Sequence, residues 1–340
     1  MSTKLTNKSP IVSKMNKIVV LILLSFVPLM NVFSQTKLNS FKITGNVSGF
    51  SDGTMIYLDG LDSTFIVNGK FSFAGSMDTK EKHVILHTKG YTDYKMLWIE
   101  SSVTQFRAKK GNFRKAEITG SGIQTTMDSL QEKIDRLGNE RNQYGNFIKN
   151  NPASILSIYL LDVYAATWGK DTTAMLFKQM TPRLKSTPYG INVSKFIALN
   201  RNIKVGDKYA DITQPNIDGK MIRLSDFENK VILLEFWGSW CAPCRKGHPE
   251  LIRIYNKYKN SGFEILGIAA DSDKAQWLSA IKEDKLPWEN ITDLKGNKNE
   301  AALIYGISHY PTNFLVKDSV VIAIDLRGEA LENKLSELLK

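Results

Sequence analysis

The stretch LEFWGSWCAPC, residues 234–244, decides how the rest of the sequence is interpreted. It overlaps the end of an apolar run, 231–237, that only Glu235 interrupts. A run of this kind fits a strand that is buried on both faces of a sheet. Cys241 and Cys244 follow at once, at the start of a predicted helix. The sequence therefore places two cysteines where a buried strand turns into a helix.

This placement suits redox chemistry of the thiols. Unpaired N–H groups and the dipole of the helix favour a thiolate at its first residue, so Cys241 is the predicted nucleophile. The two intervening residues bring Cys244 within disulfide reach as the resolving thiol, and only a thiolate attacks a disulfide. Pro243 suits the first helical turn and stiffens the loop. Arg245 and Lys246 add positive charge that should favour the thiolate further.

Two other interpretations of the cysteine pair stay open. A zinc half-site needs a second pair of ligands, and the chain has only these two cysteines and four histidines. A purely structural disulfide that closes so short a loop contributes little stability. We therefore favour the redox interpretation of the cysteine pair over these two.

Glu235 supports the redox interpretation independently. A carboxylate in the middle of a buried strand is costly unless it is paired or used. Strand alternation can direct it beneath the cysteines, where it would accept the proton of Cys244 as that thiol resolves a mixed disulfide. The alternative is an edge strand on which the carboxylate of Glu235 reaches water.

Regions before this domain show other periodicities. Alternating apolar residues between turn signals predict small strands over 36–125, in a sandwich or open barrel, with a hairpin turn at Asn68-Gly69. Two histidines in this region, His83 and His87, are interpreted as structural or surface residues. Helical spacing follows over 126–203, which we interpret as a helical connector. The predicted helices there cover 127–137, 154–164 and 174–185, with Pro152, Pro182 and Pro188 as breaks.

The N-terminus predicts export. Residues 1–17 are polar and basic, and 18–33 are mostly apolar but short and interrupted, so 1–35 reads as a signal peptide cleaved before Gln35. The alternative is an uncleaved N-terminal membrane anchor. Four lysines in this segment contribute to the formal charge of +11, and the remaining excess is diffuse, which disfavours a nucleic-acid partner.

The residues around the cysteines also carry a resemblance. Leu234–Cys244 resembles the active-site strand and turn of thioredoxins and, more closely, of the exported TlpA/ResA-type thiol–disulfide oxidoreductases. Gly206–Ala210 and Leu224–Phe227 match the entry segment of that family, and Tyr310–Leu315 matches its loop with a cis proline. The resemblance covers about 204–340. It implies a thioredoxin-like α/β fold, preceded by a small all-β domain of the kind often found ahead of such modules and by the helical connector.

The resemblance also implies roles for single residues. Pro311 is expected to be cis and to pack against the cysteines, and Tyr310 offers its backbone to an extended substrate segment. Trp240 and Thr312 are further candidate substrate-binding residues. Glu235 corresponds to the buried carboxylate of the family, so it joins the two cysteines and Pro311 as a candidate catalytic residue.

One position departs from the family pattern. Many ResA-like members carry a glutamate three residues after the second cysteine, where this chain has Gly247. The redox tuning that this glutamate provides is therefore not transferred. His248 is a candidate for part of that role, beside Pro243, and the alternative is a histidine that faces solvent.

The leading hypothesis is an enzyme of the cell envelope or periplasm that reduces or exchanges disulfides in exported proteins, in cytochrome c maturation or redox homeostasis. Its expected partners are disulfide-bearing envelope proteins and a membrane or envelope electron donor. No metal or cofactor is expected beyond the redox-active disulfide Cys241–Cys244. The alternatives are a peroxidase of the peroxiredoxin type, and a partner-binding module over 36–200 with secondary thiol activity.

Overall fold

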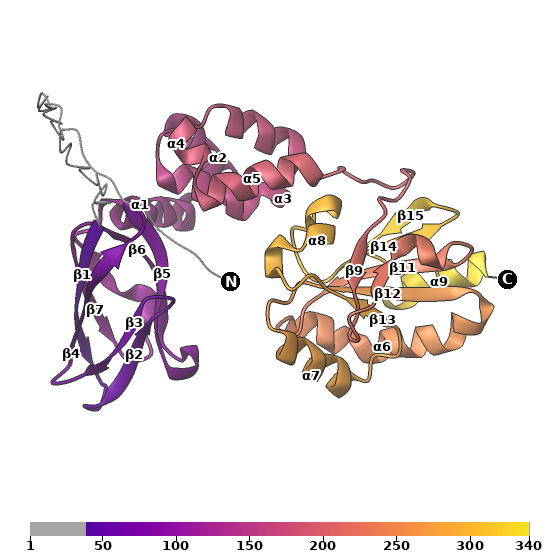
Figure 1. Cartoon of the computed structure of the whole chain (residues 1–340), viewed down its shortest axis with the longest axis horizontal. Coiled ribbons are helices and arrows are strands. Elements are labelled where there is room, and N and C mark those ends of the chain that lie inside the picture. The colour runs from indigo at the N-terminus through magenta and orange to yellow at the C-terminus, as the bar shows by residue number, and fades with distance from the viewer. Residues whose placement is uncertain (1–38, 340) are drawn as a thin grey trace, which may run out of the picture. The chain divides into compact units, whose positions relative to one another are not determined.

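The computed structural model describes residues 39–339 (Figure 1). The predicted signal peptide, 1–35, lies outside the described residues. Within 39–339 no helix combines the length and the apolar character that are needed to cross a membrane. Along the chain, a region of strands is followed by a region of helices and then by an α/β region.

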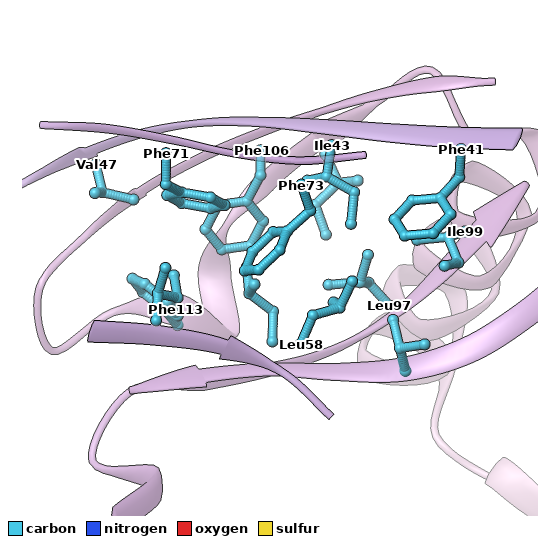
Figure 2. Packing of buried hydrophobic residues seen from close by; sticks show 14 of the residues in the cluster. Phe41, Ile43, Val47, Leu58, Phe71, Phe73, Leu97, Ile99, Phe106 and Phe113 are labelled. Atoms are coloured by element: carbon cyan, nitrogen blue, oxygen red, sulfur yellow. The ribbon is translucent and has the colours of Figure 1, made fainter. Parts of the chain in front are cut away.

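The first region is a pair of four-stranded sheets with the orders β4-β1-β7-β8 and β3-β2-β5-β6. The strands are β1 (Asn39–Ser48), β2 (Thr54–Leu58), β3 (Asp62–Ile66), β4 (Lys70–Met77), β5 (Glu81–Thr88), β6 (Tyr94–Glu100), β7 (Val103–Lys109) and β8 (Glu117–Thr119). Alternate residues of both sheets are buried in one core. Figure 2 shows this core, with Ile43, Phe73 and Phe106 facing Leu58 and Leu97. The predicted β-rich region is therefore a sandwich.

The turn at Asn68-Gly69 is present, but the expected hairpin pairing is wrong. Both residues have positive φ, 49° and 67°, as a tight hairpin turn needs. Val67 and Lys70 form a single bridge across it, and beyond this bridge the two strands belong to different sheets. Strand β4 pairs instead with β1 along eight positions. Turn chemistry fixes the reversal of the chain, whereas burial of both strands in a shared core fixes their partners.

Five helices form the middle region, namely α1 (Gly122–Leu137), α2 (Glu140–Asn150), α3 (Ile155–Lys178), α4 (Pro182–Lys185) and α5 (Pro188–Leu199). The helix expected over 127–137 is confirmed and begins earlier, where Ser121 caps the amide of Gln124. The helical pattern expected over 174–185 falls on the end of α3 and on α4, and the break expected at Pro182 lies where α4 begins. Pro182 and Pro188 occupy the first turns of new helices, where a missing N–H costs nothing.

The α/β region contains a five-stranded sheet with the order β13-β12-β11-β14-β15. Its elements are β11 (Val231–Trp237), α6 (Ala242–Tyr258), β12 (Phe263–Ala269), α7 (Lys274–Asp284), β13 (Glu289–Ile291), α8 (Glu300–Tyr305), β14 (Thr312–Lys317), β15 (Val320–Ile324) and α9 (Gly328–Leu338), after the hairpin of β9 (Thr213–Pro215) and β10 (Met221–Arg223). The central strand β11 runs parallel to β12 and antiparallel to β14.

Both faces of β11 are covered, as the apolar run predicts. Every residue of the strand is buried. Leu234 and Phe236 pack in one cluster with residues of α8, whereas Leu233 packs in another with residues of α6 and α9. Alternation places Glu235 on the face of Leu233. The carboxylate therefore points to the layer that contains α6 and the cysteines.

Candidate active site

Cys241 and Cys244 form a disulfide at the N-terminus of α6, with their Cα atoms 5.3 Å apart. Cys241 is the N-cap residue, and its sulfur accepts a hydrogen bond from the amide of Cys244 at 3.2 Å. This is the first-turn geometry in which helix amides favour negative charge on the capping atom. Both cysteines are largely buried, at 4% and 2% exposure, while the neighbouring Trp240 is 55% exposed.

Glu235 is fully enclosed on the central strand, so the alternative of an edge position reaching water is wrong. The side-chain amide of Asn313 donates to its Oε2 at 3.0 Å, and Arg327 Nη1 lies 3.2 Å from its Oε1. Burial raises the pKa of Glu235 to about 7, against the opposing effects of Arg327 and Asn313. A carboxyl group with this pKa exchanges a proton readily at neutral pH.

A cavity of about 90 Å³ is lined by both this carboxylate and Cys244. Its lining includes Glu235, Pro243, Cys244, Pro311 and Arg327. The volume is large enough to hold water, which needs polar partners of the kind that line it. Glu235 and the resolving cysteine thus line one small space, in which water can carry a proton between them.

The loop before β14 has the conformation that the resemblance implies. The Tyr310–Pro311 peptide bond is cis, which confirms that prediction. The ring of Tyr310 lies edge-on to the ring of Trp240, with centroids 5.4 Å apart. The hydroxyl of Thr312 donates to the carbonyl of His309 at 2.9 Å, so this side chain is engaged inside the loop. A substrate-binding role for Tyr310, Trp240 and Thr312 stays a prediction.

His248 lies one turn after Cys244 and is only 2% exposed, so the alternative of a solvent-facing histidine is wrong. Its Nδ1 lies 2.7 Å from a carboxylate oxygen of Asp284 on α7. Burial lowers the pKa of His248, and Asp284 opposes this effect. The ring also packs edge-on against Trp237, 5.1 Å between centroids. His248 therefore links the helix of the cysteines to α7.

The positive charge expected beside the cysteines is largely neutralised. Arg245 makes ion pairs with Asp284 at 2.7 Å and with Glu283 at 2.8 Å. The charge of Arg245 is therefore shared with two acids of α7, and its expected effect on the thiols stays a prediction. The placement of Lys246 on the exposed side of the helix leaves the helix N-terminus as the nearer source of positive potential.

Three partners in the site escape sequence reasoning, namely Asn313, Arg327 and Asp284. Each lies 36 or more residues from the group it contacts. A buried carboxylate demands a partner, but no local pattern says which of many arginines or asparagines supplies it. The two histidines of the β region have structural contacts, as predicted. His87 bridges Asp59 and the carbonyl of Thr88, and His83 packs between aromatic rings.

Two family models match the chain. Residues 205–324 match the AhpC/TSA family, and residues 41–127 match a domain of unknown function, DUF4369. The chain is 31% identical over 168 residues to the thiol-disulfide oxidoreductase ResA of Bacillus cereus, covering 49% of this chain and 95% of that protein. The ResA of Bacillus thuringiensis is 33% identical over 146 residues, with 43% and 82% covered. A solved thiol-disulfide oxidoreductase from Bacteroides fragilis is 39% identical, covering 39% of this chain and 100% of that one, with a TM-score of 0.38.

The fold and the cysteine pair thus define a thioredoxin-like thiol–disulfide oxidoreductase. Through its C-terminal α/β region the chain belongs to the ResA family of these enzymes. The predicted fold class is confirmed, with a β-rich region and helices ahead of the thioredoxin-like region. The predicted enzyme class is confirmed by the same relatives.

Proposed function

We propose that the protein acts in the cell envelope, where it reduces or exchanges disulfides in exported proteins. The observation that carries this proposal is the pair Cys241–Cys244 at the start of α6, above a cavity that it shares with Glu235. The pair is the redox centre, and no further cofactor takes part. Electrons reach it from a donor in the membrane or envelope.

The reaction starts from the reduced dithiol. The Cys241 thiolate attacks one sulfur of a substrate disulfide, which breaks that bond and releases the other substrate sulfur as a thiolate. Cys244 then transfers its proton to the Glu235 carboxylate and attacks the Cys241 sulfur. The second substrate sulfur leaves, and both partners have exchanged two electrons. The donor later returns the pair to the dithiol state.

The substrate segment lies against the exposed rim of the site. Trp240 is exposed beside the disulfide and in edge-on contact with Tyr310, so the two rings form an apolar border next to the reacting sulfur. The peptide at Tyr310 lies on the same rim, where an extended substrate can pair with it. Recognition through main-chain groups and apolar rings suits many disulfide-bearing sequences.

Export rests on the basic and apolar pattern of residues 1–35. Cleavage before Gln35 leaves the enzyme in the periplasm, where cytochrome c maturation or general redox homeostasis supplies the substrates. Sequencing of the mature N-terminus should give Gln35 as the first residue. A protein that keeps the segment and fractionates with membranes would favour the anchor instead.

Insulin reduction in the presence of dithiothreitol tests the activity. We expect the wild-type chain to accelerate it and the Cys241→Ser/Cys244→Ser variant to lose the acceleration. Cys244→Ser alone should accumulate a mixed disulfide with substrate, whereas Cys241→Ser should not. Arg253→Met, a change at an exposed arginine of α6 paired with Glu332, is the matched control. Activity that survives loss of both cysteines, or rapid stoichiometric consumption of peroxide by the dithiol, would contradict the proposal.

A further inference from the structure

The ion pair between Glu235 and Arg327 joins a buried carboxylate to a partly exposed guanidinium. Arg327 is the N-cap residue of α9, and its side chain is 42% exposed while that of Glu235 is 5% exposed. One nitrogen of the guanidinium lies 3.2 Å from Glu235, and the other lies 3.6 Å from Asp325. Within residues 39–339, Arg327 is the one cation in an ion pair with Glu235.

Backbone contacts fix the position of this arginine. The side-chain amide of Asn313 donates to Glu235 and also to the carbonyl of Leu326 at 2.9 Å. Its oxygen accepts from the amide of Leu326 at 3.1 Å. The same residue of β14 therefore holds the buried carboxylate and the chain segment that carries Arg327. Asn313 therefore fixes both Glu235 and the backbone next to Arg327, so the position of the guanidinium does not depend on the flexible arginine side chain alone.

The arginine also borders the cavity that Glu235 shares with Cys244. The other charged or titratable groups around this cavity come from α6, namely His248 and Glu250, and from the segment before α9, namely Asp325. His248 is engaged by Asp284. Arg327 is therefore positioned to favour the ionised form of Glu235 on the side where the proton must finally leave.

We propose that Arg327 is a positioning residue of the resolving step, which holds Glu235 as an oriented carboxylate ready to accept the proton of Cys244. The inference rests on the proposed function. In that step the S–H bond of Cys244 breaks and the O–H bond of Glu235 forms, while the resulting thiolate attacks the mixed disulfide. Glu235 then releases the proton to water beside Arg327, because deprotonation restores the ion pair.

The effect of Arg327 on the pKa of Glu235 determines how much the resolving step should slow when the arginine is lost. Burial raises the pKa of Glu235 to about 7, and the arginine limits this rise. An opposite charge at this range changes a carboxyl pKa by about one unit or more. Loss of Arg327 should therefore lower the ionised fraction of Glu235 at pH 7 from about one half to about one tenth. The resolving rate at pH 7 should fall about fivefold.

The test compares Arg327→Met and Arg327→Lys with the control Arg253→Met. Rapid-mixing kinetics between pH 5 and 9 should follow two steps separately, attack by Cys241 and release of substrate by Cys244. We expect Arg327→Met to move the midpoint of the release step upward by about one pH unit, with little change in the attack step. Arg327→Lys keeps a positive charge, so the midpoint of its release step should lie close to that of the wild type. Arg253→Met should match the wild type.

The same Arg327 variants in a chain that also carries Glu235→Gln distinguish a positioning role of Arg327 from a merely structural one. In a Glu235→Gln chain the carboxylate is absent, so Arg327→Lys and Arg327→Met should cause no further change in the pH profile. An equal change in both backgrounds, or an unshifted profile in Arg327→Met, would overturn the inference while disulfide reduction itself persists. If Arg327→Met fails to fold, Arg327→Gln, which also removes the positive charge, gives the same decision in the two backgrounds. Failure of the proposed function shows itself differently, as reduction that needs neither cysteine.

Discussion

Replacement of Glu235 by glutamine should change how the stability of the thioredoxin-like region depends on pH. In the folded protein the pKa of Glu235 is raised by burial from 4.5 to about 7. The folded state therefore binds this proton more tightly than the unfolded chain does. Its contribution to stability is present in full below about pH 4.5 and is lost as the pH rises through 7.

The magnitude follows from the two pKa values. A difference of about 2.5 units corresponds to about 3 kcal/mol of unfolding free energy. Glutamine does not titrate and fills nearly the same volume. The stability of the wild type relative to Glu235→Gln should therefore fall by about 3 kcal/mol between pH 4 and pH 8. A control, Glu332→Gln, should show no such change above pH 5, because hydrogen bonds from Arg253 and Lys257 lower the pKa of Glu332 to about 2.

Hydrogen exchange of the amides of Leu233 and Leu234 is the suitable assay. These residues lie in the buried centre of β11, so their slowest exchange reports the opening of this region rather than that of the other regions. Opening free energies of the oxidised proteins would be compared at several pH values, after correction for intrinsic exchange. Parallel profiles for the wild type and Glu235→Gln would refute the reasoning, since they would mean that the carboxyl group has an ordinary pKa.

Three further changes test other contacts. Asp284→Asn should lower the NMR titration midpoint of His248, because the carboxylate opposes the effect of burial; an unchanged midpoint would contradict the assigned pairing. Leu315→Ala should cost about 2–5 kcal/mol in denaturant unfolding, since this side chain is fully buried beside β11, and a cost below about 1 kcal/mol would be inconsistent with that packing. Trp240→Ala should slow attack on protein disulfides more than attack on a small disulfide, and equal slowing would argue against a role in docking.

The sequence predicts the strand and helix of the site because their signals are local and agree. The apolar run over 231–237 is one strand, and the helix predicted at the cysteines begins at Ala242. The predicted pairing of the strands on either side of Asn68-Gly69 is wrong, because a tight turn specifies only that the chain reverses and not which strand each one pairs with. The break expected at Pro182 is confirmed, because α3 ends at Lys178 and α4 begins at Pro182, a residue that suits the first turn of a helix.

The residues of the site likewise fall into those that the sequence predicts and those that it does not. The cysteines and Glu235 are visible in the sequence because a thiol pair at a helix start and a charge in a buried strand are exceptional locally. Arg327 is not visible, since an arginine before a terminal helix is an ordinary surface residue until the fold brings it to within 3.2 Å of Glu235. Long-range partners of a buried charge depend on sheet order, which the local pattern does not contain.

The redox equilibrium of Cys241–Cys244 tests the central claim most directly. The mature protein would be equilibrated in graded thiol/disulfide buffers, and its free thiols would be counted by alkylation. We predict a reversible two-electron transition with a potential near or below about −270 mV, in the range of a thiol reductant. A potential near about −120 mV would identify an oxidant that forms disulfides instead. A pair that never cycles would contradict the redox account itself.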